Sequence, residues 1–253
     1  MAVAPAVRPY LSLWPAPNGR DFGDGTAEYI SSKAATTTEN FWLARTDFNL
    51  SHNDFLFIRF SFDNAASLIF PSPVPNFGTD LASGYRFLTI EENKLISPST
   101  SNMFRFAVNR TRSSTRDRIF TKIDPSLMFV SGAPVFGSII FGGNTAQSIH
   151  NPLSSGRNPD DSIVNLFQYQ DTVSMVRGKH AWKAGGMVNR YELNDRNSSG
   201  DLGGQYQFPS LALFLAGRPN NVRLTAPEAV VGRGYRQLLF GFFAQDEDRK
   251  SVV

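Results

Sequence analysis

Hydrophobic and polar residues alternate along several stretches of about ten residues, which is the pattern of β-strands with one apolar face. The clearest case is FLFIRFSFDN at residues 55–64, where Leu56, Ile58, Phe60 and Phe62 point one way and Arg59, Ser61 and Asp63 point the other. The preceding stretch, FWLARTDFNL at residues 41–50, alternates in the same way, and only the polar residues SHND separate the two. Such a pattern predicts an antiparallel hairpin.

The same pattern predicts further strands along the chain. A second pair comprises YRFLTIEENKLI at residues 85–96 and NMFRFAVNRT at residues 102–111, joined by the turn-like SPSTS. A third hairpin centres on the polar RGKH within residues 169–194, and YRQLLFGFFAQDE near the end forms a last strand. The last long loop contains QYQF and SLALFLAG, which we expect to form a short strand and a short helix.

The connections between these strands alternate between short and long. The long segments lie around residues 65–84, 112–161 and 193–235, and each of the others spans only a few residues. Outer-membrane barrels keep this rhythm, with tight periplasmic turns and long extracellular loops. The sequence therefore predicts an all-β, antiparallel up-and-down meander of about seven long strands that forms a partial transmembrane β-barrel.

Composition supports strands and narrows the class of protein. The 253 residues include 22 Phe and 7 Tyr, with only 19% charged residues, a usage that favours strands over helices. The net charge of +3 comes mostly from scattered arginines, so no nucleic-acid partner is expected. The absence of cysteine excludes a disulfide framework and a thiolate metal site. No apolar run approaches the ~18 to 20 residues of a membrane helix.

Alternation assigns each predicted strand a lipid-facing and a lumen-facing side. The predicted lipid-facing residues are Trp42, Phe48, Ile58, Phe60, Phe104, Phe106, Val173, Trp182, Phe240 and Phe242. The predicted lumen-facing residues are Arg45, Asp47, Arg59, Asp63, Arg105, Gln168, Gln170, Lys183 and Asn189. One residue does not fit, because Asp171 lies on the apolar side of its strand. A carboxylate there should lie near an interface, pair with a neighbour such as Arg190, or mark a register shift.

Candidate catalytic and metal-binding residues have simpler interpretations as structural residues. The three histidines, His52, His150 and His180, are scattered, and Asp21–Gly25 lacks the spacing of a calcium loop. Glu91 and Glu92 cannot form a glycosidase pair, because neighbours on a strand point to opposite faces. No catalytic residue, cofactor or metal is therefore expected. A soluble carbohydrate-binding sandwich, with Phe60, Phe106 and Phe242 packed together, is the alternative, and a glycosidase is a more distant one.

Several segments resemble the barrel region of TonB-dependent outer-membrane receptors, in particular the Oar-like kind that carries a carboxypeptidase-regulatory-like domain. These segments are ARTDFNLSHNDFLFIRFSFDNA, NMFRFAVNRT, NLFQYQDTVSMVRGKHAWKAGGMVNRY and LFGFFAQDE. The resemblance covers most of residues 5–248, although Arg249 stands where the family usually has Trp.

The resemblance implies a transporter that imports a bulky, scarce substrate through a barrel of about twenty-two strands, with energy supplied by TonB. Outer-membrane lipid would be one partner, and the TonB complex, acting through a plug region outside this chain, another. It further implies an extracellular-loop-like segment at residues 1–40 and a partial receptor barrel at 41–248. We expect residues 249–253 to be an aberrant, truncated end, and the chain to be a fragment that is inactive alone. Seven strands should not close a barrel.

Overall fold

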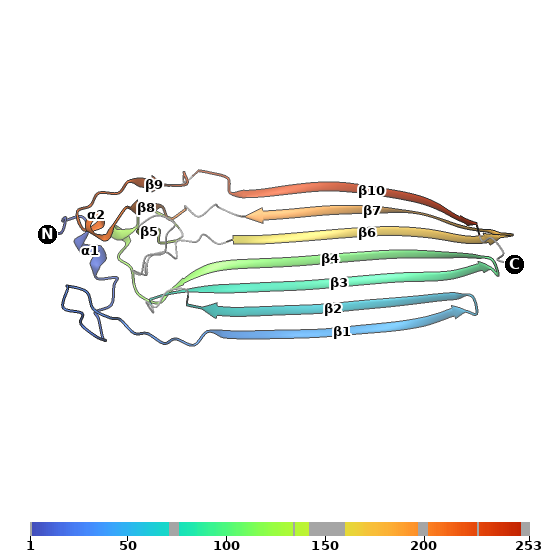
Figure 1. The fold of residues 1–253 in the computed structure, drawn as a ribbon, viewed down its shortest axis with the longest axis horizontal. Helices are drawn as coiled ribbons and strands as arrows, with labels where there is room; N and C mark the ends of the chain where they lie inside the picture. Colours follow the sequence, from blue (N-terminus) through green and yellow to red (C-terminus); the bar gives the residue numbers. More distant parts are fainter. Residues whose placement is uncertain are drawn as a thin grey trace.

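A computed structural model of the chain describes residues 2–70, 76–133, 135–141, 160–196, 202–226 and 228–248. Seven long strands form one antiparallel sheet in the order β1-β2-β3-β4-β6-β7-β10, so each strand pairs with its neighbours along the chain (Figure 1). The strands are β1 (Thr36–Ser51), β2 (Asp54–Ile69), β3 (Phe77–Ser97), β4 (Thr100–Ile119), β6 (Asp160–Arg177), β7 (His180–Arg196) and β10 (Gly232–Asp248). The predicted antiparallel meander of seven strands is confirmed, and the sheet is open, with edges at β1 and β10.

Tight turns join the strands at one end of this sheet, and long connections join them at the other (Figure 1). Only His52 and Asn53 separate β1 from β2, and only Gly178 and Lys179 separate β6 from β7. Gly178 has a φ of 62°, a conformation that tight hairpin turns require and that glycine adopts at little cost. The predicted alternation of short and long connections is therefore confirmed.

The strands are longer than the alternation predicted. They contain 16 to 21 residues instead of about ten, and the additional residues lie mostly on the loop side. The predicted long segments around residues 65–84, 112–161 and 193–235 were consequently too long. Residues 65–69, 77–84 and 112–119, for example, belong to β2, β3 and β4. Ser, Thr, Ala and Gly dominate β2 and β3 there, and backbone pairing needs no apolar face.

A small unit of short elements lies at the loop end of the sheet (Figure 1). Strands β5 (Ser138–Phe141), β8 (Gln205–Phe208) and β9 (Asn221–Arg223) form a second, three-stranded sheet. Helices α1 (Arg8–Leu11) and α2 (Leu211–Leu215) and the 3-10 turn η1 (Pro125–Leu127) complete the unit. The predicted strand in QYQF and the predicted helix in SLALFLAG are both confirmed. The Ser210 hydroxyl caps α2 by accepting a hydrogen bond from the Leu213 amide (3.3 Å).

These short elements enclose a hydrophobic core, which we call the loop-end cluster. Its buried members come from the N-terminal segment, the start of β3, the loop before β5, β5 itself, β8 and α2: Val7, Leu13, Phe77, Phe136, Ile139, Phe208 and Phe214. The Phe214 ring lies 5.2 Å from the ring of Phe208 and 5.6 Å from that of Trp14, measured between centroids. Because Phe77 is the first residue of β3, it joins this cluster to the large sheet.

Over most of its length, the seven-stranded sheet is a single layer in the described part of the chain. Phe242 is 81% exposed, and Phe60 and Phe106 are only partly buried. A sandwich would have packed these three residues against one another, so the soluble-sandwich interpretation is not favoured. None of the described helices is long and apolar enough to cross a membrane.

Candidate functional site

The register of the sheet sorts its side chains onto two faces, because directly opposed residues of antiparallel strands point to the same side. Counting across the sheet places every predicted lipid-facing residue on one face and every predicted lumen-facing residue on the other. We call the first the aromatic face, exemplified by Trp42, Phe106 and Phe240. We call the second the polar face, exemplified by Arg45 and Gln168. The assignment of these faces to lipid and lumen remains a prediction.

Aromatic and aliphatic side chains form a band across the middle of the aromatic face, interrupted by Glu92, Asp171 and Arg190. One row of directly opposed residues consists of Thr46, Ile58, Ile90, Phe106, Tyr169, Val188 and Phe240. The rings of Phe106 and Tyr169 in this row are 4.9 Å apart. On β2 the band extends from Leu56 to Phe62, about 20 Å along the strand at ~3.3 Å per residue.

Asp171 lies near the turn-side edge of this apolar band. It stands in a regular register, opposite Phe104 on β4 and Gly186 on β7, so no register shift accommodates it. The Asn102 side-chain amide donates a hydrogen bond to its carboxylate (2.5 Å). Arg190 instead donates to Glu192 (2.8 Å), which corrects the suggestion that Arg190 could pair with Asp171. Pairing with Asn102 reduces the cost of placing this carboxylate on an apolar face.

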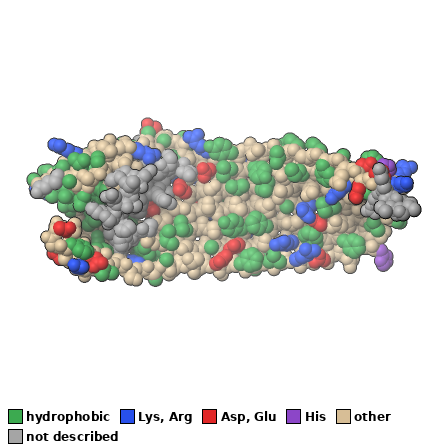
Figure 2. Space-filling model, in the orientation of Figure 1, with side chains coloured by type: hydrophobic (Ala, Val, Ile, Leu, Met, Phe, Trp, Pro, Cys, Tyr) green, Lys and Arg blue, Asp and Glu red, His purple; other side chains and the backbone are tan. Residues whose placement is uncertain are grey.

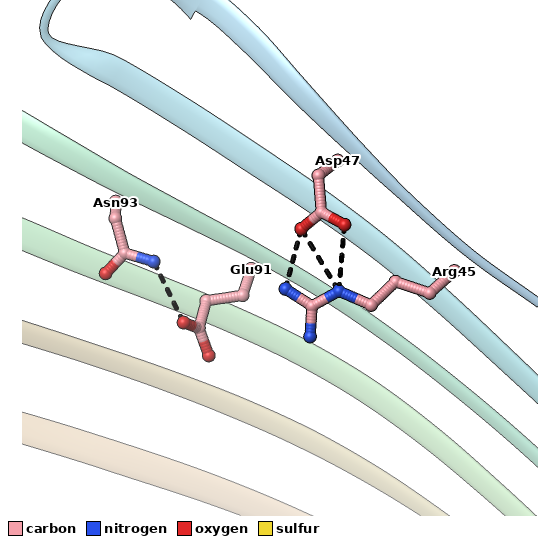
Figure 3. Close-up of polar contacts among 4 residues, drawn as sticks. All are labelled: Arg45, Asp47, Glu91 and Asn93. Carbon is pink, nitrogen blue, oxygen red and sulfur yellow. Dashed lines mark hydrogen bonds and ion pairs between the residues drawn. The ribbon is translucent and has the colours of Figure 1, made fainter.

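On the polar face, charged side chains form two neighbouring groups, one on β1 beside the Phe57 ring and one across β3 and β4. Arg45 donates to Asp47 (2.6 Å), and its guanidinium carbon lies 4.2 Å from the ring centroid of Phe57. Glu91 accepts hydrogen bonds from Arg105 Nε (2.6 Å) and from the Asn93 amide (2.9 Å). Figure 3 shows the contact between Arg45 and Asp47 and the contact between Asn93 and Glu91. Glu91 and Asn93 were missed as lumen-facing residues. Side chains alternate along β3, and the register that places Glu91 opposite Arg105 puts both residues on the polar face.

Uncharged amides form a second network on the polar face, across β4, β6 and β7. Asn109 donates to Gln168 (3.1 Å), and Gln168 donates in turn to Asn189 (3.4 Å). Gln168 and Asn189 were predicted for this face, and Asn109 joins them because it lies on the same side of β4. Cross-strand amide ladders keep polar groups satisfied next to water without trapping a charge.

Low accessibility of small and polar side chains also distinguishes the polar face. Ser61, Glu91, Ala107, Thr172 and Asn189 are at most 8% exposed, and each lies on this side of the sheet. They lie mid-sheet, away from the loop-end cluster, so neighbouring side chains on the same sheet cover them. A sheet that curls toward this face produces such crowding. Figure 2 shows basic, acidic and hydrophobic side chains interspersed over one side of the molecule.

Several of the remaining candidates have structural partners. Asp21 accepts a hydrogen bond from the Gly23 amide (2.8 Å), and Asp24 accepts bonds from the Thr26 amide and hydroxyl (2.9 and 2.5 Å). These Thr26 bonds lower the pKa of Asp24. The distance between His180 Nδ1 and Asp246 Oδ2 is 2.9 Å. His150 falls outside the described residues. Glu91 and Glu92 face opposite sides, as predicted.

An antiparallel meander with one apolar and one hydrogen-bonded polar face defines a segment of β-barrel wall. The sequence matches the model of the outer membrane beta barrel domain over residues 1–249, and the chain belongs to this family. The protein accordingly resides in the outer membrane.

One solved structure with the same fold is the outer membrane transporter YddB from Escherichia coli. The similarity covers 84% of this chain with a TM-score of 0.52 and 7% sequence identity. This chain spans only about a quarter of that transporter, since the match covers 25% of its length. No curated protein matches the sequence.

Proposed function

We propose that the chain forms part of the barrel wall of a TonB-dependent, Oar-like outer-membrane transporter that imports a bulky, scarce substrate. In this proposal the aromatic face contacts lipid and the polar face lines the lumen. The tight turns lie in the periplasm, and the loop-end cluster lies outside the cell. The chain acts as a wall and supplies no catalytic centre.

The main support is the separation of the two predicted sets of residues by the register of the sheet. An apolar band that crosses every strand fits acyl chains, whereas hydrogen-bonded polar networks fit a water-filled passage. The open edges at β1 and β10 carry unpaired backbone groups, which cost several kcal/mol each in hydrocarbon. Pairing with further strands of a larger barrel satisfies these groups. The similarity to an outer membrane transporter is consistent with such a barrel.

Cysteine labelling tests the assignment of the faces, because the chain contains no cysteine. Phe167→Cys and Gln168→Cys are matched variants, since these adjacent residues of β6 point to opposite faces. In bilayers we expect a water-soluble maleimide to label Q168C and leave F167C unreacted. Both should react after unfolding, which is the control. Reaction of F167C alone would contradict the proposed orientation.

The sidedness of the sheet is tested in intact cells with a maleimide carried on a polymer too large to pass the outer membrane. Lys179 lies in a tight turn, and Ala133 lies in the loop before β5. We expect A133C to react in intact cells and K179C to react only after lysis. The reverse pattern would place the tight turns outside the cell.

Transport is tested by comparing the medium of cells that express the complete barrel protein carrying this chain, with and without TonB. We expect at least one large solute to be depleted only when both the protein and TonB are present. If depletion persists without TonB, the protein is a transporter, but its coupling to TonB is wrong. No difference in any solute would contradict import.

A further inference from the structure

Arginines gather on the aromatic face between the apolar band and the loops. From the row of Trp42 and Arg86 toward the loops, the described strands carry seven on this face: Arg86, Arg110, Arg112, Arg116, Arg118, Arg196 and Arg236. The carboxylates of the same region are Asp80, Asp161 and Glu192. We propose that this arginine belt binds the phosphate groups of a glycolipid in the outer leaflet. The inference rests on the proposed function, which turns this face toward lipid.

The belt borders an open hollow of about 700 Å³. Its floor consists of small residues on β2, β3 and β4, namely Ala66, Ala82, Gly84 and Ser114. Its walls include four of the arginines: Arg86, Arg110, Arg112 and Arg116. Long cationic side chains around a floor of small residues leave room for a phosphorylated sugar. Planar guanidinium groups bind phosphate through two parallel hydrogen bonds.

The contacts of these arginines leave positive charge in excess. Arg86 donates to the side-chain carbonyl of Asn64 (3.1 Å), and Arg110 donates to that of Asn165 (2.8 Å). Both acceptors are neutral, so these bonds hold the guanidinium groups in place without neutralising them. Arg112 and Arg116 share the single carboxylate of Asp161, at 3.6 and 3.0 Å. An anion is the ligand that compensates this charge.

The hollow adjoins the upper edge of the apolar band. The guanidinium carbon of Arg86 lies 4.0 Å from the ring centroid of Phe62, and this ring stacks on Trp42 at 5.6 Å. Trp42, Phe62, Arg86 and Arg110 occupy one row across β1 to β4. Aromatic side chains mark the boundary between hydrocarbon and headgroups in outer-membrane barrels. A molecule with acyl chains and phosphates therefore fits the band and the belt together.

The polar face of the same region carries the opposite charge. Its described strand residues include five carboxylates, Glu39, Asp63, Asp117, Asp160 and Asp195, and one arginine, Arg233. If the arginines served only to attract anions in general, they would not be concentrated on one face of the sheet. This asymmetry directs anionic groups to the outer surface of the wall and away from the passage. The occupant we infer is therefore a lipid headgroup.

The test uses the complete barrel protein that carries this chain, with fluorescent bisphosphorylated lipid A in detergent as the probe. We expect R86Q/R110Q to weaken binding about thirtyfold, because each basic residue near an anionic membrane surface contributes about fivefold. The matched control, R177Q/R233Q, removes the same charge from the turn end and from the polar face, and binding should stay within about twofold. If the double variant fails to fold, R110Q alone should still lose about fivefold.

Two further measurements identify the ligand. Lipid A without phosphates should bind much more weakly, and inorganic phosphate at millimolar concentration should not displace the probe. Equal binding of the dephosphorylated lipid, displacement by inorganic phosphate, or unchanged binding to R86Q/R110Q would overturn the inference. Labelling of F167C and Q168C separates this failure from that of the proposed function. With Q168C alone labelled and no lipid A bound, only the arginine belt is wrong.

Discussion

The loop-end cluster and the seven-stranded sheet place their aromatic residues in opposite environments. In the cluster, Phe214 is 2% exposed and touches the rings of Phe208 and Trp14. In the sheet, Phe242 is 81% exposed, and Trp182 is 48% exposed. The cluster encloses its apolar side chains within the protein, whereas the sheet presents them outward over a band that crosses all seven strands.

This difference shows which solvent each part requires. A monomer in water rarely exposes so extended an apolar surface. In the proposed orientation the bilayer covers this band. The loop-end cluster has its own core and is stabilised because its apolar side chains are removed from water. Under this proposal, one chain combines a sheet that the membrane stabilises with a cluster that its own core stabilises. Substitutions that act on one part and spare the other test this division.

The largest effect is expected for Phe214→Ala in the loop-end cluster. Removing a buried aromatic ring costs about 3–5 kcal/mol, which should unfold the cluster. Because this core meets the sheet at the start of β3, away from the apolar band, the folded state of the sheet in bilayers should persist. Proteolysis of the loops, measured beside the gel mobility of the folded barrel, distinguishes the two parts. Leu211→Ala is the control, since Leu211 is 39% exposed on the same helix. Simultaneous unfolding of the sheet would contradict independent stabilisation.

A smaller effect is expected for Phe240→Arg in the middle of the apolar band. An arginine at mid-depth on the lipid side of a barrel costs about 2–4 kcal/mol. Leu239→Arg is the matched control, because Leu239 precedes Phe240 on β10 and points to the polar face. The difference is measured by chemical unfolding of the protein in bilayers. An equal loss of unfolding free energy at the two positions would mean that both faces contact the same environment.

Alternation of residue types located all seven strands of the sheet but not their ends. Between Leu56 and Phe62 the apolar face repeats every second residue, and the prediction succeeds. Beyond Asn64, β2 continues through Ala65, Ala66 and Ser67, where neither face is distinctly apolar. The backbone ladder holds this part of the strand to β3. Hydrogen bonding between backbones leaves no pattern in the sequence, so the extensions could not be predicted from it.

The sequence also predicted which face of its strand a side chain occupies better than it predicted which side chains meet across strands. The alternation of side chains along β6 and β7 is enough to place Gln168 and Asn189 on the polar side of their strands. Which residues meet across strands depends on where each turn begins. The Glu91 and Arg105 pair is fixed only when the turn is known to lie at Pro98 and Ser99. Asp171 was unexplained for the same reason, because its partner Asn102 lies on a neighbouring strand at a diagonal position.

The smallest effect is expected for Glu91→Gln on the polar face. Glutamine retains the shape of Glu91 but loses the charge that Arg105 pairs with. The Arg105 side chain is 44% exposed, whereas that of Glu91 is 10% exposed, so water reaches the pair from the arginine side. An ion pair with such access to solvent contributes only about 0.5–1 kcal/mol, and salt should reduce it further.

Unfolding in bilayers at low and high salt measures this effect, with Glu92→Gln on the opposite face as the control. A loss of about 3 kcal/mol or more that does not respond to salt would identify a desolvated pair. In that case the polar face would be shielded from water, and a water-filled passage along it would be wrong. A small, salt-sensitive loss instead supports the contrast in which the polar face contacts water and the aromatic face contacts lipid.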